Sequence, residues 1–316
     1  MTKDSNSISG VLVTGANGQL GCELKRLFES DSPISVGYFK NHHADRSIFY
    51  TDIAELDICN IDDVRQYIID NKIGLIINCA AYTAVDKAEG DAEIAYRVNG
   101  DAPGILATVG AEVGALLIHI STDYVFNGKG NIPYNEEDKP SPLSVYGRTK
   151  LTGEYAIASS GCRYIIIRTS WLYSIYGDNF VKTILRLASE HETINVTFDQ
   201  IGTPTNAADL ASAIVIIASQ VTEQKKLTGI INTIYHFSNE GVCSWYDFAS
   251  EIVNYSGLKC KVLPVTSDMF PTKAQRPVFS VLNKRKIKAA FGIEIQHWRT
   301  SLQDCLITLI NIKKIL

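Results

Sequence analysis

The chain has 316 residues, 46% hydrophobic and 20% charged, with 30 Lys and Arg residues against 34 Asp and Glu. This apolar content excludes a mainly disordered chain, and the net charge of −4 argues against a nucleic-acid coat or a polybasic membrane binder. No apolar run approaches the roughly 20 residues of a membrane span. The polar start lacks a signal-peptide core, and the seven scattered cysteines are typical of reduced thiols. We therefore expect a cytoplasmic protein with no nucleic-acid or membrane partner.

Short apolar runs alternate with helical patterns up to about residue 170. A run at 11–13 leads into a glycine-rich turn and then into the helical stripe of Leu20, Leu24 and Leu27. Further strand-like runs are found at 34–39, 75–79 and 115–120, whereas the segment 40–56 is polar and irregular. Asn60 is a candidate cap for a helix between the runs at 34–39 and 75–79. A long helical pattern covers 91–113.

Strands that are apolar on both faces and alternate with helices predict a parallel sheet covered on both sides. The fold class expected is therefore α/β, a doubly wound Rossmann-type sheet. Beyond about residue 172, helices are predicted at 178–190, 206–220, 244–256 and 298–312. We predict a polar tail (1–9), a dinucleotide-binding domain (10–171) and a smaller C-terminal substrate-binding part (172–316) interleaved with it.

A glycine-rich turn follows the first predicted strand, with Gly15, Gly18 and Gly21 spaced three apart. Glycine permits a tight turn and a close approach of a pyrophosphate, and the following helix offers free N–H groups and a positive dipole end. A plain turn between a strand and a helix is the alternative. The spacing differs from the general Rossmann fingerprint, so the turn indicates a dinucleotide without indicating the reaction.

The end of the second strand discriminates between nicotinamide cofactors, because an acid there binds the ribose 2′-hydroxyl of NAD. We expect this end at Tyr38 and Phe39, followed by Lys40, and the first acid comes only at Asp45. Lys40 would meet a 2′-phosphate, unless it is only a solvated loop charge. The sequence therefore favours NADP(H), with NAD(H) as the alternative.

A threonine, a tyrosine and a lysine form the candidate catalytic group. Thr122 ends a predicted strand, and Tyr146 and Lys150 are four residues apart at the start of a helix, which puts them on one face. A lysine ammonium beside the phenol is expected to lower the tyrosine pKa. Such a tyrosine can exchange a proton with a carbonyl or alcohol oxygen, and Thr122 can donate a second hydrogen bond to that oxygen. A surface Tyr–Lys pair is the alternative.

The blocks TGANGQLG, INCAAYTAVDKAE, HISTDYVFNG, YGRTKLTGE, RTSWLY and DQIGTPT occur in this order. Together they resemble the dTDP-4-dehydrorhamnose reductases of the extended short-chain dehydrogenase/reductase superfamily, from about residue 10 to residue 305. The resemblance implies reduction of the 4-keto group of dTDP-4-dehydro-β-L-rhamnose to dTDP-β-L-rhamnose by NADPH.

The resemblance also assigns residues to roles. Tyr146 is the implied proton donor, Lys150 supports it and binds the nicotinamide ribose, and Thr122 polarises the keto oxygen. The implied cofactor-binding residues are Gly15, Gly18, Gln19, Leu20, Gly21, Asp57, Ile58, Ala80, Ala81 and Tyr82, with Tyr146 and Lys150. The implied contacts to the dTDP-sugar are Asp123, Trp171 and Arg276, with Thr122 and Tyr146. Trp171 as a core aromatic and Arg276 as a surface residue are the alternatives.

Some family members form a homodimer through magnesium held by glutamates. Glu23 matches one such position, but Ala207 and Ala208 follow the GTPT block where a further ligand would stand, with Asp209 only nearby. The sequence leaves the magnesium site and the homodimer open.

Three other functions compete with this reading. A non-catalytic NADP-binding subunit, like the beta subunit of methionine adenosyltransferase, has the same fold. A sugar-nucleotide dehydratase or epimerase is disfavoured because Tyr124 stands where dehydratases carry a glutamate after the Thr-Asp pair. A reductase of a related nucleotide-linked deoxysugar remains the third alternative.

Overall fold

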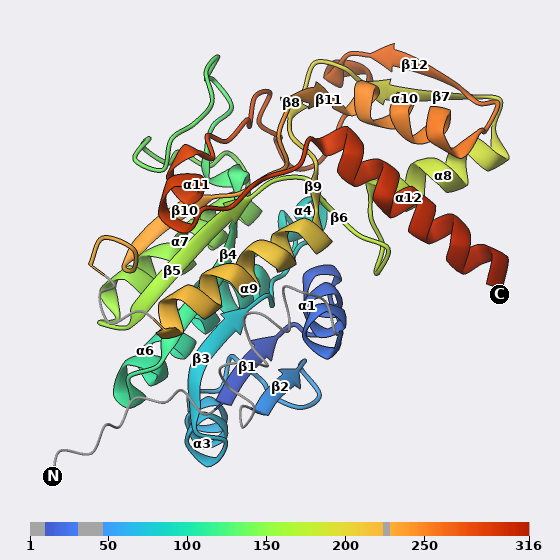
Figure 1. The fold of residues 1–316 in the computed structure, drawn as a ribbon. Helices are drawn as coiled ribbons and strands as arrows, with labels where there is room; N and C mark the ends of the chain where they lie inside the picture. Colours follow the sequence, from blue (N-terminus) through green and yellow to red (C-terminus); the bar gives the residue numbers. More distant parts are fainter. Residues whose placement is uncertain (1–9, 31–46, 224–227, 316) are drawn as a thin grey trace, which may run out of the picture.

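The computed structural model describes residues 10–30, 47–223 and 228–315, and Figure 1 shows a parallel sheet at its centre. The strand order is β10-β5-β4-β3-β1-β2, and every neighbouring pair is parallel. The six strands are β1 (Gly10–Thr14), β2 (Ser47–Thr51), β3 (Ile73–Asn78), β4 (Leu116–Thr122), β5 (Arg163–Thr169) and β10 (Thr233–His236). The predicted doubly wound sheet is confirmed.

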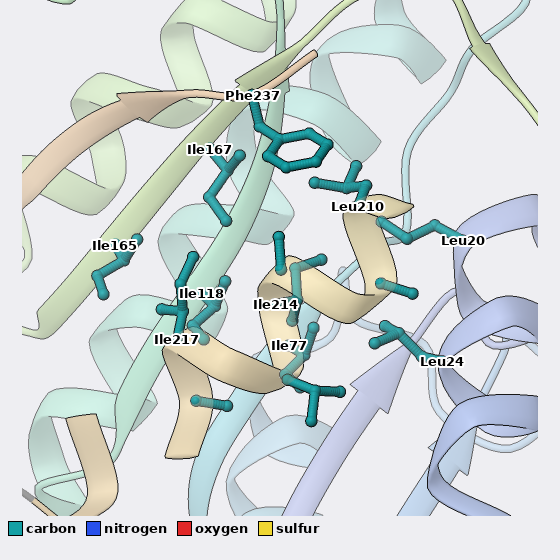
Figure 2. Packing of buried hydrophobic residues seen from close by; sticks show 14 of the residues in the cluster. Leu20, Leu24, Ile77, Ile118, Ile165, Ile167, Leu210, Ile214, Ile217 and Phe237 are labelled. Atoms are coloured by element: carbon teal, nitrogen blue, oxygen red, sulfur yellow. The ribbon is translucent and has the colours of Figure 1, made fainter. Parts of the chain in front are cut away.

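Helices cover both faces of this sheet. One face carries α1 (Gln19–Glu29), α9 (Ala207–Glu223) and α11 (Arg285–Phe291). Figure 2 shows Leu210, Ile214 and Ile217 of α9 lying over Ile77 and Ile118 of the sheet. The other face carries α3 (Ile61–Asp70), α6 (Ala102–Val113) and α7 (Val145–Ser159). Both faces are buried, which explains why the strands are apolar throughout their length.

Local sequence signals fix several of these helix ends. The Asn60 side chain accepts hydrogen bonds from the backbone of Asp62 and Asp63, as its position before α3 predicts. Gly114 ends α6 in the left-handed conformation, with φ of 72°. The helix predicted over 91–113 is broken into α5 (Ala92–Tyr96), a π-helical turn (Arg97–Asp101) and α6.

The C-terminal half builds a second cluster beside the sheet and also returns to it. The cluster contains α8 (Phe180–Glu190), α10 (Trp245–Ser256), α12 (Trp298–Ile315) and the parallel pair β7 (Thr193–Thr197) and β12 (Lys261–Val265). The remaining short elements are α4 (Val85–Ala88), β6 (Leu172–Tyr173), β8 (Ile201–Gly202), β9 (Thr205–Asn206), β11 (Cys243–Ser244) and the 3₁₀ turns Asp123–Val125 and Ser267–Met269. Because α9 packs on the central sheet and β10 is its edge strand, the chain passes between the two parts more than once. The functional boundary at 171/172 stays a prediction.

The second strand differs from the prediction. The strand paired with β1 is β2, at 47–51, inside the segment 40–56 that the sequence predicts to be irregular, so that prediction is wrong. Its edge position explains the weak signal, because four of its five residues are exposed or only partly buried. The run at 34–39 lies outside the described residues. Within the described ranges, no helix is long and apolar enough to cross a bilayer.

Candidate active site

A cavity of about 830 Å³ opens at the carboxyl end of the central sheet. Parallel strands end at the same edge, so Thr14, Thr122 and Thr169, the last residues of β1, β4 and β5, all line it. From β1, the next strand in the chain lies on one side, at β2, whereas β3, β4, β5 and β10 follow one another on the other side. Ligands of open α/β sheets bind where the chain changes direction in this way, here between β1 and β3. A volume in this range is typical of a site for a small ligand or cofactor.

The glycine turn forms one wall of the cavity. Gly15 has φ of 64°, and a side chain there would meet the Ala80 backbone at 2.6 Å. A side chain on Gly21 would meet the carbonyl oxygen of Gly15 at 2.4 Å, so this glycine lets α1 pack against the turn. Gly18 and Gln19 line the cavity at the N-terminus of α1, as does Leu20. The predicted turn therefore has the shape, the bare backbone and the helix end that a pyrophosphate needs.

Asp57 and Ile58, which the family resemblance assigns to the adenine, also line the cavity. Asp57 is fixed by Arg97, whose Nη2 donates to its Oδ2 at 3.1 Å. Asp52, directly after β2, also lines the cavity and accepts a hydrogen bond from the Asn17 backbone N–H at 3.2 Å. The acid expected at the end of the strand beside β1 therefore exists, at a position that the sequence analysis missed. Lys40 lies outside the described residues.

The segment after β3 forms another wall. Ala80, Ala81 and Tyr82 all line the cavity, as implied. Asn99, in the π-helical turn, holds this segment: it accepts from the Tyr82 N–H at 2.8 Å and donates to the Tyr82 carbonyl at 3.0 Å. Asn99 is fully buried, and single π-helical turns inside α-helices are frequent at functional sites. The regular helix predicted over 91–113 runs through this turn without a break, so the π-helical turn was not predicted.

The three candidate catalytic residues come together in the cavity. Thr122 ends β4, and Tyr146 and Lys150 lie on successive turns of α7. The Ser144 side chain caps α7 by accepting from the Gly147 N–H at 3.1 Å. Lys150 is 1% exposed, and its Nζ donates to the Ile120 carbonyl at 2.7 Å. A surface Tyr–Lys pair is thus excluded.

The electrostatics of Tyr146 differ from the expectation. Burial raises its pKa to about 12, and a hydrogen bond with Thr122 offsets only part of this rise. The prediction that Lys150 lowers the pKa of Tyr146 is wrong for this arrangement, because the Nζ of Lys150 faces the Ile120 carbonyl and the His119 ring. Tyr146 therefore keeps its proton at neutral pH, which is the form that a proton donor requires.

Asp123 lies beside this group and is 2% exposed. Burial raises the pKa of its carboxyl to about 6, although hydrogen bonds from Ser280 and Thr122 act in the opposite direction. The Thr122 hydroxyl donates to Oδ1 at 3.0 Å, whereas Oδ2 has no hydrogen-bond partner within the described part of the chain. A buried acceptor without a partner, in a residue that lines the cavity, is suited to receive a hydroxyl of a sugar.

Trp171 lines the cavity from the C-terminal side. It stacks on Trp245, with ring centroids 3.6 Å apart, and it has φ of 48°, which is unusual for a bulky residue. Gly202 leaves room for the ring, because a side chain there would lie 2.6 Å from it. Trp171 is therefore not a simple core aromatic, and Trp245 is a cavity residue that the sequence analysis did not select.

Arg276 does not line the main cavity. It lines a neighbouring cavity of about 300 Å³ with Gln200 and Lys273, and its Nη2 bonds Asp86 Oδ2 at 2.8 Å. Its Nε is buried and has no hydrogen-bond partner among the residues described. Burial raises the pKa of Tyr124, which lines the main cavity, and the charge of Arg276 partly opposes this rise, so the two cavities are neighbours.

Glu23 has partners inside the chain. Its carboxylate accepts from Ser174 at 2.7 Å and pairs with Arg26 at 3.0 Å. In the described ranges, no group of three or more His, Cys, Asp or Glu side chains is arranged to hold a metal ion.

A family model described as the RmlD substrate binding domain matches residues 9–310. The chain belongs to the dTDP-4-dehydrorhamnose reductase family. A dTDP-4-dehydrorhamnose reductase of Sinorhizobium fredii is 39% identical, over 92% of this chain and 94% of that protein. The spore coat polysaccharide biosynthesis protein SpsK of Bacillus subtilis is 40% identical, over 94% of this chain and 96% of its own length.

Solved structures of the dTDP-4-dehydrorhamnose reductase family agree with this assignment. The enzyme of Clostridium acetobutylicum aligns with a TM-score of 0.85 and 37% identity, over 95% of this chain and 99% of that one. The enzyme of Bacillus anthracis, solved in complex with NADP, aligns with a TM-score of 0.84 and 37% identity, over 96% of this chain and all of that one (100%). A dTDP-glucose 4,6-dehydratase of Streptomyces venezuelae, at 15% identity, shares the fold alone.

Proposed function

We propose that this family member reduces the 4-keto group of dTDP-4-dehydro-β-L-rhamnose to dTDP-β-L-rhamnose, with NADPH as the cofactor and Tyr146 as the proton donor. The observation that carries the proposal is the meeting of Thr122, Tyr146 and Lys150 in one cavity with the glycine turn. The family membership selects the substrate among the keto sugars that such a site could reduce.

The residues of the cavity fit a nicotinamide dinucleotide. The turn at Gly15 and Gly18 presents backbone without side chains, and the same cavity is lined by Asp57, Tyr146 and Lys150. When bound there, NADPH supplies the hydride that adds to the keto carbon. Lys150 would hold the nicotinamide ribose.

The chain's own part of the reaction is to orient the keto group and deliver a proton. With the pKa of Tyr146 raised to about 12 by burial, its hydroxyl is protonated at neutral pH and can give that proton to the oxygen that becomes an alkoxide. Thr122 would turn its hydroxyl from Asp123 toward the substrate and donate a hydrogen bond to the same oxygen. The free Oδ2 of Asp123 would then accept a neighbouring sugar hydroxyl.

The nucleotide half of the substrate would extend toward Arg276. The small cavity combines the positive charges of Arg276 and Lys273 with the amide of Gln200, and a guanidinium fork suits a diphosphate. Asp86 would orient the guanidinium through its hydrogen bond. Trp171 would cover the sugar between the two cavities.

The test follows NADPH absorbance while coupling enzymes convert dTDP-glucose to the dTDP-4-keto-L-sugar. We expect consumption of NADPH that depends on every coupling enzyme, and formation of dTDP-rhamnose. The same mixture without the enzyme that inverts the sugar to the L series tests for a reductase of a related deoxysugar. Binding of NADPH without consumption on any of these sugars would contradict the proposal and favour a binding module.

A further inference from the structure

A line of buried hydrogen bonds runs beneath the cavity from β1 to α7. Thr14 Oγ1 donates to Asn78 Oδ1 at 2.7 Å, Asn78 Nδ2 lies 3.0 Å from His119 Nδ1, and His119 Nε2 lies 3.2 Å from Lys150 Nζ. These four residues are at most 1% exposed. Asn78 and His119 have no role in the reaction proposed above.

The direction of these hydrogen bonds can be read from one backbone group. Asn78 Oδ1 accepts from the Ala80 backbone N–H at 3.1 Å, and a backbone N–H can only donate, so this atom is the amide oxygen. The amide nitrogen therefore donates to His119 Nδ1. That nitrogen must then be unprotonated, which places the single proton of the neutral ring on Nε2.

The Nε2–H of His119 consequently points at Lys150. An ammonium has three donors and no acceptor, so a charged Lys150 would set donor against donor, whereas an amine has a lone pair that accepts. The amine can still donate to the Ile120 carbonyl at 2.7 Å. The ring itself stays neutral, because burial holds the pKa of His119 well below its usual range.

The other groups around Lys150 do not supply a free counter-charge. Glu154, one turn further along α7, is paired with the buried Arg168, whose Nη2 lies 2.6 Å from Oε2. Burial raises the pKa of the Cys79 thiol to about 12, so this group is neutral, as is the phenol of Tyr146. Burial lowers the pKa of Lys150 to about 8, and the attraction of Glu154 only partly opposes this.

We propose that His119 is a positioning residue that holds Lys150 as an uncharged amine in the free protein at alkaline pH, and that Lys150 takes up one proton there when NADP(H) binds. The Nζ lone pair forms the new N–H bond, solvent supplies the proton, and the contact with His119 Nε2–H is released. The negative phosphates of a dinucleotide in the same cavity favour the ammonium. The proposal rests only on the binding of NADP(H), not on the identity of the sugar.

Calorimetry of NADPH binding at pH 9, in two buffers of different ionisation enthalpy, tests the proton uptake. We expect the wild-type protein to take up most of one proton more than Lys150→Met, which has no amine to titrate. Equal uptake by the two proteins would overturn the proposal. Absence of binding in both would contradict the cofactor instead.

A titration of the free protein tests Lys150 directly. With ¹³C-labelled lysine, the ε-carbon signal that disappears in Lys150→Met should titrate near pH 8. A midpoint at or above the ordinary lysine value of 10.5 would overturn the proposal, even if no cofactor bound.

Two variants of His119 isolate its Nε2–H. His119→Asn keeps an oxygen near the position of Nδ1 to accept from Asn78 but has no donor toward Lys150, so we expect the lysine midpoint to rise and proton uptake to fall by at least half. His119→Gln carries an amide that reaches the Nε2 position and should retain the uptake. Unchanged titration in His119→Asn would show that His119 does not position Lys150. If this variant fails to fold, the comparison with Lys150→Met still decides the proton uptake.

Discussion

Trp171 and Trp245 stack face to face, with centroids 3.6 Å apart and ring planes 8° from parallel. The two residues are far apart in sequence, one between β5 and β6 and the other at the start of α10, and both line the main cavity. The stack holds an aromatic surface over the position proposed for the sugar. Its rigidity depends on Gly202, which leaves no side chain to displace Trp171.

Gly202→Ala should therefore impair the sugar substrate and spare the cofactor. A methyl group there would lie 2.6 Å from the Trp171 ring, so the ring must move. We expect kcat/KM for the dTDP-sugar to fall on the order of tenfold, about 1.4 kcal/mol, with the Kd of NADPH unchanged. Gly90→Ala is the matched control, because its nearest neighbour would lie at 3.7 Å. An equal loss of cofactor affinity would show that the stack is structural.

Tyr146→Phe should remove turnover and leave cofactor binding. The change deletes one hydroxyl and keeps the ring, which packs against Tyr124 with centroids 5.5 Å apart. General acid catalysis contributes roughly 10²–10⁴-fold, so kcat should fall by at least about 100-fold. Thr122→Val should reduce kcat less, because it removes a polarising hydrogen bond and not the proton. Steady-state rates and a fluorescence titration of NADPH measure the two effects, and an unchanged kcat in Tyr146→Phe would exclude its role as donor.

Asp123→Asn should stabilise the protein at neutral pH. With the pKa of Asp123 raised to about 6, the folded protein binds this proton more tightly than the unfolded chain. The protonated carboxyl therefore makes its full contribution to the stability of the folded protein below pH 4, and this contribution is lost as the pH rises through 6. At pH 8, the free energy of unfolding of the variant should exceed that of the wild type by up to about 3 kcal/mol, and the difference should shrink toward pH 5.

Urea denaturation at pH 5 and pH 8 measures this difference. Asp101→Asn, at an exposed position, serves as the control. A stability difference for Asp123→Asn that is the same at both pH values would contradict the raised pKa. Loss of affinity for the sugar in this variant would separately support Asp123 as a substrate ligand.

Asp52→Asn should shift the cofactor preference toward NADPH. A negative charge at the end of the strand beside β1 repels a 2′-phosphate and binds a 2′-hydroxyl. Asp52 is only partly buried, so we expect the ratio of the NADPH Kd to the NADH Kd to fall by roughly threefold to tenfold, about 1 kcal/mol. Titration of both cofactors measures this ratio, and an unchanged ratio would place Asp52 away from the 2′ position.

Lys40→Ala tests the contact to a 2′-phosphate that the sequence predicts, although β1 pairs with 47–51 and not with 34–39, and Lys40 lies outside the described residues. Loss of one charge-assisted hydrogen bond to a phosphate should weaken NADPH binding by about 1.5–3 kcal/mol. NADH, which has no 2′-phosphate, provides the internal control. Equal weakening of both cofactors, or tighter binding of NADH by the wild type, would contradict the role given to Lys40.

The sequence was most informative where a residue's role depends on its near neighbours. The glycine turn, the Asn60 cap and the four-residue spacing of Tyr146 and Lys150 are local patterns, and the structure reproduces each of them. The edge strand β2 escaped notice because a half-exposed strand of five residues lacks a continuous apolar run. Because the second strand was predicted at 34–39, the acid at its end was expected near residue 40 and not at Asp52.

Features that depend on distant contacts could not be predicted in this way. Nothing near Trp245 in the sequence indicates that it will stack on Trp171. The pKa of Tyr146 was assigned from its spacing to Lys150, but burial and the direction in which the lysine points determine it. Arg276 likewise lies in a neighbouring cavity because it pairs with Asp86, on a helix almost two hundred residues earlier.

Because α9 and β10 return to the central sheet, the chain cannot be cut after residue 171 without removing part of that sheet and its cover. A fragment that ends at residue 171 would lack the helix that covers Ile77, Ile118 and Ile165, and the edge of β5 would be unpaired. Such a fragment should therefore aggregate instead of forming a free-standing cofactor module. A chimera of two relatives joined at this boundary would place α9 of one protein on the strands of the other, so the buried contacts of α9 would have to match.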